Sequence, residues 1–155
     1  MNGLHSYQKL NPDRRFMQIR DNRLRVLVVE NSRVLAKRLV EWLEADERII
    51  VVSVADTASR AIDEERRLQP DVVIVDVALA GRSSGYDVMR AISIEPDSER
   101  PTVIVFTNHT SRPYRDAARR LGATHFFDKS NDFMRMVGEV GRLAERRSTR
   151  NGSEG

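Results

Sequence analysis

Short runs of branched, apolar residues recur along the chain, separated by stretches long enough to hold a helix. The runs are RVLVV at 25–29, IIVVSV at 49–54, DVVIV at 71–75, TVIVF at 102–106 and HFF at 125–127. Their apolar residues follow one another without polar alternation, which is typical of strands buried on both faces of a parallel sheet. The runs therefore predict five strands, of which HFF is a short fifth one.

Amphipathic segments separate the runs. Ser32 stands at a helix N-cap position, and Leu35, Leu39 and Leu43 follow it at helical spacing. Further helices are expected over 58–68 and 86–94, between Pro113 and Gly122, and from Phe133 to Ala144. The alternation predicts an α/β fold, a doubly wound (βα)5 domain with a five-stranded parallel sheet and helices on both faces.

Length and composition point to one folded unit of 155 residues without disulfides, because no cysteine is present. We expect a polar N-terminal arm over 1–23, the domain over 24–147 and a flexible C-terminal tail over 148–155. No run approaches the ~20 apolar residues of a membrane span, and no signal peptide is evident. We therefore expect a cytoplasmic protein that does not bind membranes. The 26 basic and 23 acidic residues leave a net charge of only +3, so nucleic acid is not an expected partner.

Polar residues follow four of the five predicted strands at their carboxyl ends. They are Glu30 and Asn31, Asp76, Thr107, and Asp128 with Lys129. Each has an ordinary explanation as a cap, turn or surface residue. However, ligands of open α/β sheets bind at the carboxyl ends of the strands. The convergence of acids, a hydroxyl and a lysine on this edge therefore predicts a reactive site.

The segments VLVVEN, PDVVIVDVALAGRSSGYDVMRAI, TVIVFTN and LGATHFFDKS carry a resemblance. In this order and spacing, they are similar to response-regulator receiver domains, the CheY-like module of two-component signalling, over about residues 24–147. The resemblance implies a sheet with strand order 2-1-3-4-5. It also implies that Asp76 accepts a phosphoryl group from a histidine kinase or a phosphotransfer protein.

The same resemblance assigns roles to individual residues. Lys129 would pair with the phosphoryl oxygens, and Thr107 would move its hydroxyl onto them. Phe126 matches the aromatic switch position, whose ring turns inward when Thr107 moves. Mg²⁺ would be held by the metal-binding positions Glu30, Asn31, Asp76 and the carbonyl of Ala78.

One departure from the family concerns the metal. Asn31 stands where an acid is usual, so two carboxylates remain where the family commonly has three. We expect weak Mg²⁺ binding and either slow phosphorylation or partial independence from it.

Three functions remain open at this point. The first is a phosphoacceptor receiver, not classed as an enzyme, that acts on a downstream protein target or forms a homodimer. The surface expected for this contact is the fourth helix, fifth strand and fifth helix, with Arg112, Arg115, Arg119, Arg120 and Arg135. The second is a degenerate receiver that binds proteins without being phosphorylated. The third, a nucleotide or flavin enzyme, is disfavoured because VVENSRVLA contains no glycine-rich phosphate loop.

Overall fold

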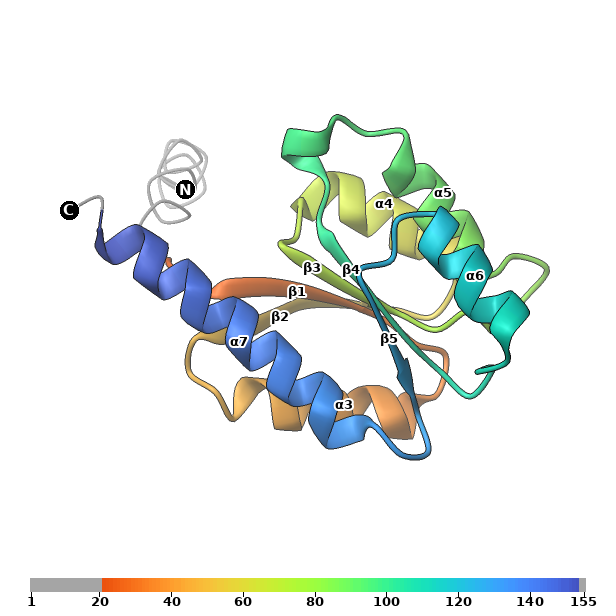
Figure 1. The fold of residues 1–155 in the computed structure, drawn as a ribbon, viewed down its shortest axis with the longest axis horizontal. Coiled ribbons are helices and arrows are strands. Elements are labelled where there is room, and N and C mark those ends of the chain that lie inside the picture. Colours follow the sequence, from red (N-terminus) through yellow and green to blue (C-terminus); the bar gives the residue numbers. More distant parts are fainter. Residues whose placement is uncertain (1–20, 154–155) are drawn as a thin grey trace, which may run out of the picture.

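Five parallel strands form the centre of the molecule (Figure 1). The computed structural model describes residues 21–153. The strand order is β2-β1-β3-β4-β5, which confirms the predicted topology. The strands are β1 (Leu24–Val29), β2 (Ile49–Ala55), β3 (Val72–Val75), β4 (Thr102–Thr107) and β5 (His125–Asp128).

β1 and β3 end level with one another, and β4 continues beyond them to Thr107. Val29 of β1 pairs with Val75 of β3, and Val75 pairs with Val105 of β4. Thr107 of β4 pairs with Asp128 of β5. This register brings the residues that follow the strands to one edge of the sheet, as the sequence predicts.

Helices cover both faces of the sheet. Figure 1 shows α3 (Arg33–Glu44) and α7 (Phe133–Gly152) on one face and three helices on the other. Those three are α4 (Ala58–Leu68), α5 (Gly85–Ser93) and α6 (Arg112–Arg120), and a short 3-10 helix, η1 (Asp97–Glu99), precedes β4. Each face has its own apolar core. Val88 and Met89 of α5 lie in one, and Leu39 of α3 with Met136 of α7 in the other.

Capping residues explain where several helices begin. The Leu35 N–H donates to Ser32 Oγ (3.3 Å), which confirms the predicted N-cap of α3. Ser84 and Asp87 form a reciprocal capping box at the start of α5. Pro113 lies in the first turn of α6, and Gly122 follows that helix with φ +94°.

The C-terminal boundary differs from the prediction. The sequence predicts a flexible tail from residue 148, but α7 continues to Gly152. The extra turns are stabilised by Arg147, whose Nη1 donates to Asp71 Oδ1 (2.7 Å), and by Thr149, whose hydroxyl donates to the Glu145 carbonyl (3.0 Å). The predicted N-terminal arm lies outside the described residues except for its last three. Within 21–153, no helix is long and apolar enough to span a membrane.

Candidate functional site

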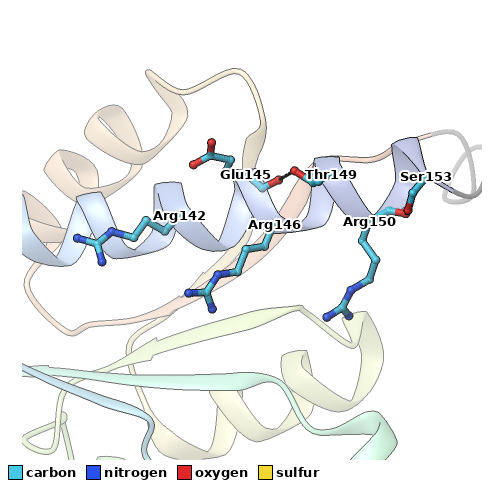
Figure 2. Close-up of a pocket in the computed structure, with 6 residues that line it drawn as sticks. All are labelled: Arg142, Glu145, Arg146, Thr149, Arg150 and Ser153. Atoms are coloured by element: carbon cyan, nitrogen blue, oxygen red, sulfur yellow. Dashed lines mark hydrogen bonds between the residues drawn. The ribbon is translucent and has the colours of Figure 1, made fainter.

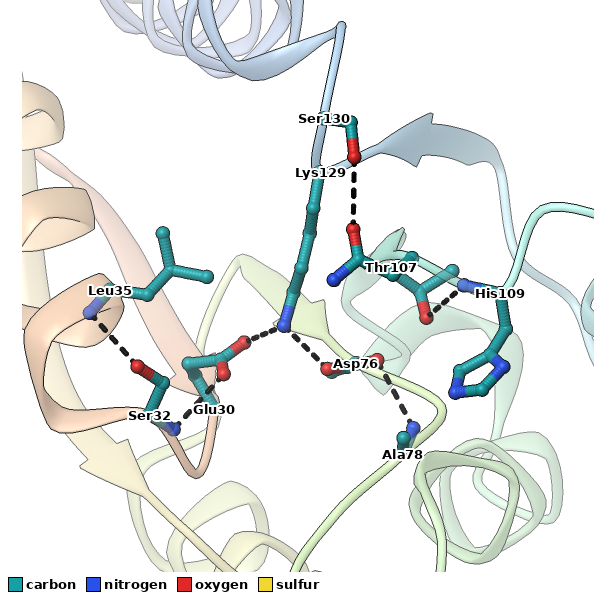
Figure 3. A network of polar contacts seen from close by, with 10 residues as sticks. Glu30, Ser32, Leu35, Asp76, Ala78, Thr107, His109, Lys129 and Ser130 are labelled. Atoms are coloured by element: carbon teal, nitrogen blue, oxygen red, sulfur yellow. Dashed lines mark hydrogen bonds and ion pairs between the residues drawn. The ribbon is translucent and has the colours of Figure 1, made fainter.

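Glu30, Asp76 and Lys129 meet at the carboxyl edge of the sheet (Figure 3). They follow β1, β3 and β5, three strands far apart in sequence. Lys129 Nζ lies 2.5 Å from Asp76 Oδ2 and 2.7 Å from Glu30 Oε2. The two carboxylate side chains are 6% and 3% exposed. A single ammonium group therefore bridges two almost fully buried carboxylates.

Main-chain N–H groups hold the other oxygen of each carboxylate. The Ala78 N–H donates to Asp76 Oδ1 (3.1 Å), and the Ser32 N–H donates to Glu30 Oε1 (3.1 Å). Both acids are thus fixed by a cation on one oxygen and by the backbone on the other. This arrangement leaves Asp76 Oδ2 as the oxygen that faces the lysine.

The protonation of Lys129 follows from its surroundings. Burial by itself lowers the pKa of Lys129, but the hydrogen bonds and charges of Asp76 and Glu30 outweigh burial and raise that pKa above its ordinary value. Lys129 therefore stays charged at neutral pH and supplies a permanent cation to the site.

Thr107 is fully buried at the end of β4. Its Oγ1 accepts a hydrogen bond from the His109 N–H (3.2 Å), and its carbonyl accepts one from the Lys129 N–H (3.0 Å). The main chain thus links Thr107 to Lys129, while the hydroxyl bonds the loop that follows β4. The sequence-predicted Asp76, Lys129 and Glu30 are in direct contact, and Thr107 joins them through the backbone.

A glycine allows α5 to approach the site. A Cβ atom at Gly85 would lie 2.1 Å from the Asp76 carbonyl oxygen, far inside contact distance. The Gly85 N–H donates to the Val77 carbonyl (3.0 Å). The loop between Asp76 and α5 therefore closes back onto the acid only because residue 85 has no side chain.

Sequence reasoning missed one contact near the site. Phe126 of β5 is half-buried, and Arg115 of α6 lies over its ring, with Cζ 4.6 Å from the ring centroid. Arg115 Nε also donates to the Thr110 carbonyl (2.8 Å). No pattern in the sequence distinguishes Arg115 from the other arginines of α6.

The model of the response regulator receiver domain family matches residues 26–140. The chain belongs to this family. The match includes Glu30, Asp76, Thr107 and Lys129, so all four lie within the receiver domain.

Curated relatives of this receiver domain are named protein-glutamate methylesterase/protein-glutamine glutaminase. The protein from Symbiobacterium thermophilum is 37% identical over 109 residues, which are 68% of this chain and 29% of the relative. The protein from Syntrophus aciditrophicus is 36% identical over 100 residues, 64% of this chain and 28% of the relative. The chain thus spans less than a third of the length of these relatives.

Solved structures share the receiver fold. A signal receiver domain from Vibrio parahaemolyticus is 28% identical with a TM-score of 0.71, covering 86% of this chain and 98% of that one. The response regulator domain of Thermotoga maritima CheB is 22% identical with a TM-score of 0.69, covering 81% and 96%. The second likeness shows the fold alone.

The oxygen donors of the receiver site suit a small hard cation. Glu30 Oε2 and Asp76 Oδ2 converge on one position, where Lys129 Nζ now lies, and carboxylate oxygens are ligands that Mg²⁺ prefers. Asn31 follows Glu30 and is exposed. In the described part of the chain, no three His, Cys, Asp or Glu side chains come together as a metal-binding group. Glu30 and Asp76 are thus the two carboxylates that would be available to a divalent ion at this position.

The receiver domain also carries a basic surface away from this site. Figure 2 shows Arg142, Arg146 and Arg150 projecting from α7, with Glu145 and Thr149 on the neighbouring part of the helix surface. They line a shallow hollow of about 550 Å³ with Glu145, Thr149 and Ser153. This end of α7 is the one that Arg147 ties to Asp71, just before β3, so it lies at the amino ends of the strands.

Proposed function

We propose that this chain is a phosphoacceptor receiver of a two-component phosphorelay, with Asp76 as the residue that accepts the phosphoryl group. The contact of Lys129 with Asp76 (2.5 Å) and Glu30 (2.7 Å) is the observation that carries the proposal. A buried carboxylate beside a permanent cation is suited to hold a transferred anion. The donor would be a phosphohistidine of a histidine kinase or of a phosphotransfer protein.

The transfer would begin at Asp76 Oδ2. This oxygen attacks the phosphorus of the phosphohistidine, so that an O–P bond forms and the P–N bond breaks. The electron pair of the P–N bond stays on the imidazole nitrogen, which takes a proton from solvent. Asp76 thereby becomes an acyl phosphate. Lys129 exchanges its bond to Asp76 for one to a phosphoryl oxygen, so its charge stays paired.

Mg²⁺ belongs to the same proposal. Glu30, Asp76, the amide oxygen of Asn31 and the carbonyl of Ala78 would hold it. The ion supplies neutralisation of the charge that develops on the phosphoryl oxygens. Because Asn31 contributes no charge and Lys129 competes for the same two carboxylates, we expect weak binding.

The signal would leave the site through Thr107 and Phe126. The Thr107 hydroxyl would exchange its bond from the His109 N–H for one to the phosphoryl group, drawing the loop after β4 inward. The half-buried Phe126 ring would turn inward with it. A local charge change that moves a two-state loop is an established kind of switch.

The output would be a protein contact in the cytoplasm. The α6–β5–α7 face carries Arg112, Arg115, Arg119, Arg120 and Arg135, which favours an acidic protein target over a second copy. The methylesterase and glutaminase activities in the names of the relatives are not part of this proposal, because the chain spans less than a third of their length.

A degenerate receiver is the second candidate. It is favoured by Asn31 and by the way Lys129 already pairs with both carboxylates, which weakens the need for an incoming cation. In this case the chain would bind its target without being phosphorylated at Asp76.

Intact-mass measurement after incubation with acetyl phosphate, with and without Mg²⁺, separates the two candidates. A phosphoacceptor gains the mass of one phosphoryl group, faster with Mg²⁺, and Asp76→Asn abolishes the gain. Asp71→Asn, which changes an acid at the opposite edge of the sheet, is the control and leaves the gain intact. No gain from acetyl phosphate or from a phosphorylated phosphotransfer protein would refute phosphorylation of Asp76.

A further inference from the structure

We propose that Arg115 is a positioning residue that holds Phe126 and the loop after β4 in one arrangement, and that releasing it favours phosphorylation. This inference rests on the proposed phosphoacceptor function. It assigns a role to a side chain of α6 that does not touch the reacting atoms.

Two contacts made by one side chain support the inference. The Arg115 guanidinium lies over the Phe126 ring, with Cζ 4.6 Å from the ring centroid, within the range of a cation–π interaction. The same guanidinium donates from Nε to the Thr110 carbonyl (2.8 Å). Arg115 therefore connects the ring on β5 to the loop 108–111 through a single rigid, planar group.

The loop that Arg115 grips begins at Thr107. The Thr107 hydroxyl accepts the His109 N–H (3.2 Å), and the His109 ring packs against that of Tyr114, with ring centroids 5.0 Å apart. The Tyr86 hydroxyl donates to the Tyr114 carbonyl (3.2 Å), which adds a tie to α5. The loop is thus held from both ends, and Arg115 is the member of this set that also reaches Phe126.

Free space lies beside the ring. Arg115, Ala118, Arg119, Ala123 and Phe126 line a cavity of about 160 Å³ with Thr124 and His125. The small side chains of Ala118 and Ala123 leave this space, so packing alone does not fix the ring there. The contact of the Arg115 guanidinium with the ring therefore helps to hold Phe126 in place.

The contacts of Arg115 favour the arrangement of Phe126 and of the loop after β4 that is seen in the unphosphorylated protein. If Phe126 turns inward and the loop moves toward Asp76 upon phosphorylation, both contacts of Arg115 must break. A contact present in only one of two states shifts the equilibrium toward that state. Removing it is expected to raise the fraction of the other state about tenfold, which corresponds to about 1.4 kcal/mol.

The matched variants are Arg115→Ala and Arg119→Ala. Arg119 lies one turn further along α6 and lines the same cavity, but within the described residues it makes no cation–π contact with Phe126 and no hydrogen bond to Thr110. Hydrogen exchange of residues 108–111, read by mass spectrometry on the unphosphorylated protein, should quicken about tenfold in Arg115→Ala and stay unchanged in Arg119→Ala. In a Phe126→Leu background, Arg115→Ala should quicken the hydrogen exchange of residues 108–111 by only about twofold.

The second readout is the rate of phosphoryl gain from acetyl phosphate. We expect Arg115→Ala to gain the group severalfold faster than the wild type, a result that mere damage to the fold would not give. Unchanged exchange in Arg115→Ala, equal acceleration in Arg119→Ala, or a rate of phosphorylation at or below wild type would each overturn the inference. If neither wild type nor variant gains a phosphoryl group, the proposed function fails, whereas the exchange data still decide whether Arg115 holds the loop.

Discussion

At the scale of single residues, Lys129 determines the electrostatics of the site. Its ammonium lies between two buried carboxylates that would repel each other without it. Buried charges are tolerated when they are paired, and removal of one partner leaves the other uncompensated. The behaviour of Lys129 variants should therefore depend on the charge of Asp76.

Lys129→Gln should lower the free energy of unfolding by about 3 kcal/mol at neutral pH, because Glu30 and Asp76 then face each other without a cation. Urea denaturation measures the change. The double variant Lys129→Gln/Asp76→Asn should recover part of the loss, and saturating Mg²⁺ should do the same for Lys129→Gln. A double variant less stable than Lys129→Gln alone would contradict this account.

Asn31→Asp should strengthen Mg²⁺ binding about tenfold, because a third carboxylate would join Glu30 and Asp76. Titration calorimetry of the wild type and the variant measures the difference. Asn151→Asp, at the far end of α7, makes the same chemical change away from the site and should leave the affinity as it is. Equal affinities in wild type and Asn31→Asp would mean that residue 31 does not contribute to the metal site.

At the scale of helices, two contacts determine how α5 and α4 sit on the sheet. Gly85 begins α5 against the Asp76 carbonyl, where no side chain fits. Glu65 of α4 is almost fully buried, and the neighbouring Glu95, which follows α5, helps to raise the pKa of Glu65. The first contact ties a helix to the site, and the second joins two helices through ionisable groups.

Gly85→Ala should destabilise the domain by about 3 kcal/mol and slow phosphoryl transfer, because the new methyl group displaces either α5 or the Asp76 backbone. Gly138→Ala is the control. Its Cβ would meet nothing within 4 Å, in the interior of α7, so this variant should gain about 0.5–1 kcal/mol from the higher helix propensity of alanine. Thermal unfolding of both variants measures the contrast, and an unchanged midpoint for Gly85→Ala would be inconsistent with the close approach.

Glu65 should make stability depend on pH. Burial, followed by the hydrogen bond and the charge of Glu95, raises the pKa of Glu65 from 4.5 to about 7. Between these values the unfolded chain releases the proton while the folded chain keeps it, so the contribution of Glu65 to stability is fully present below pH 4.5 and is lost as pH rises toward 7. Glu65→Gln should abolish this decline, which we expect to be on the order of 2 kcal/mol, in urea titrations at several pH values. An equally steep decline in Glu65→Gln would assign it to other groups.

At the scale of the whole molecule, the alternation of strands and helices could be predicted because β1 to β4 are continuous runs rich in branched apolar residues, whereas the strand order followed from the family resemblance. The end of α7 could not be predicted, because polar residues such as Ser148 and Thr149 give no apolar period, and the contact of Arg147 with Asp71 joins distant segments. For the site, the edge where the residues meet follows from the strand order. The contacts of Lys129 with both acids and of Arg115 with Phe126 could not be predicted. They depend on loop conformation and side-chain rotamers, which the spacing of residues in the sequence does not determine.

The charge of the whole α6–β5–α7 face predicts its oligomeric behaviour. Two copies meeting through this face would bring arginines of α6 and α7 together, which is unfavourable at low ionic strength. Sedimentation velocity should therefore show a monomer at about 50 mM salt, where the screening length exceeds ~10 Å. Arg119→Glu/Arg135→Glu, which creates opposite charges on the face, should associate more strongly than the wild type. A wild-type dimer that weakens with added salt would contradict this prediction.

Lys129 follows an edge strand, and this position has a consequence for communication. All four residues of β5 are only half-buried, and the strand has a neighbour on one side only. Lys129, which pairs with two buried carboxylates, thus directly follows a strand that has no buried residue. A protein that binds this edge strand would displace Lys129 and change the charge beside Asp76. If Asp76 accepts a phosphoryl group as proposed, such binding would alter the rate of that reaction.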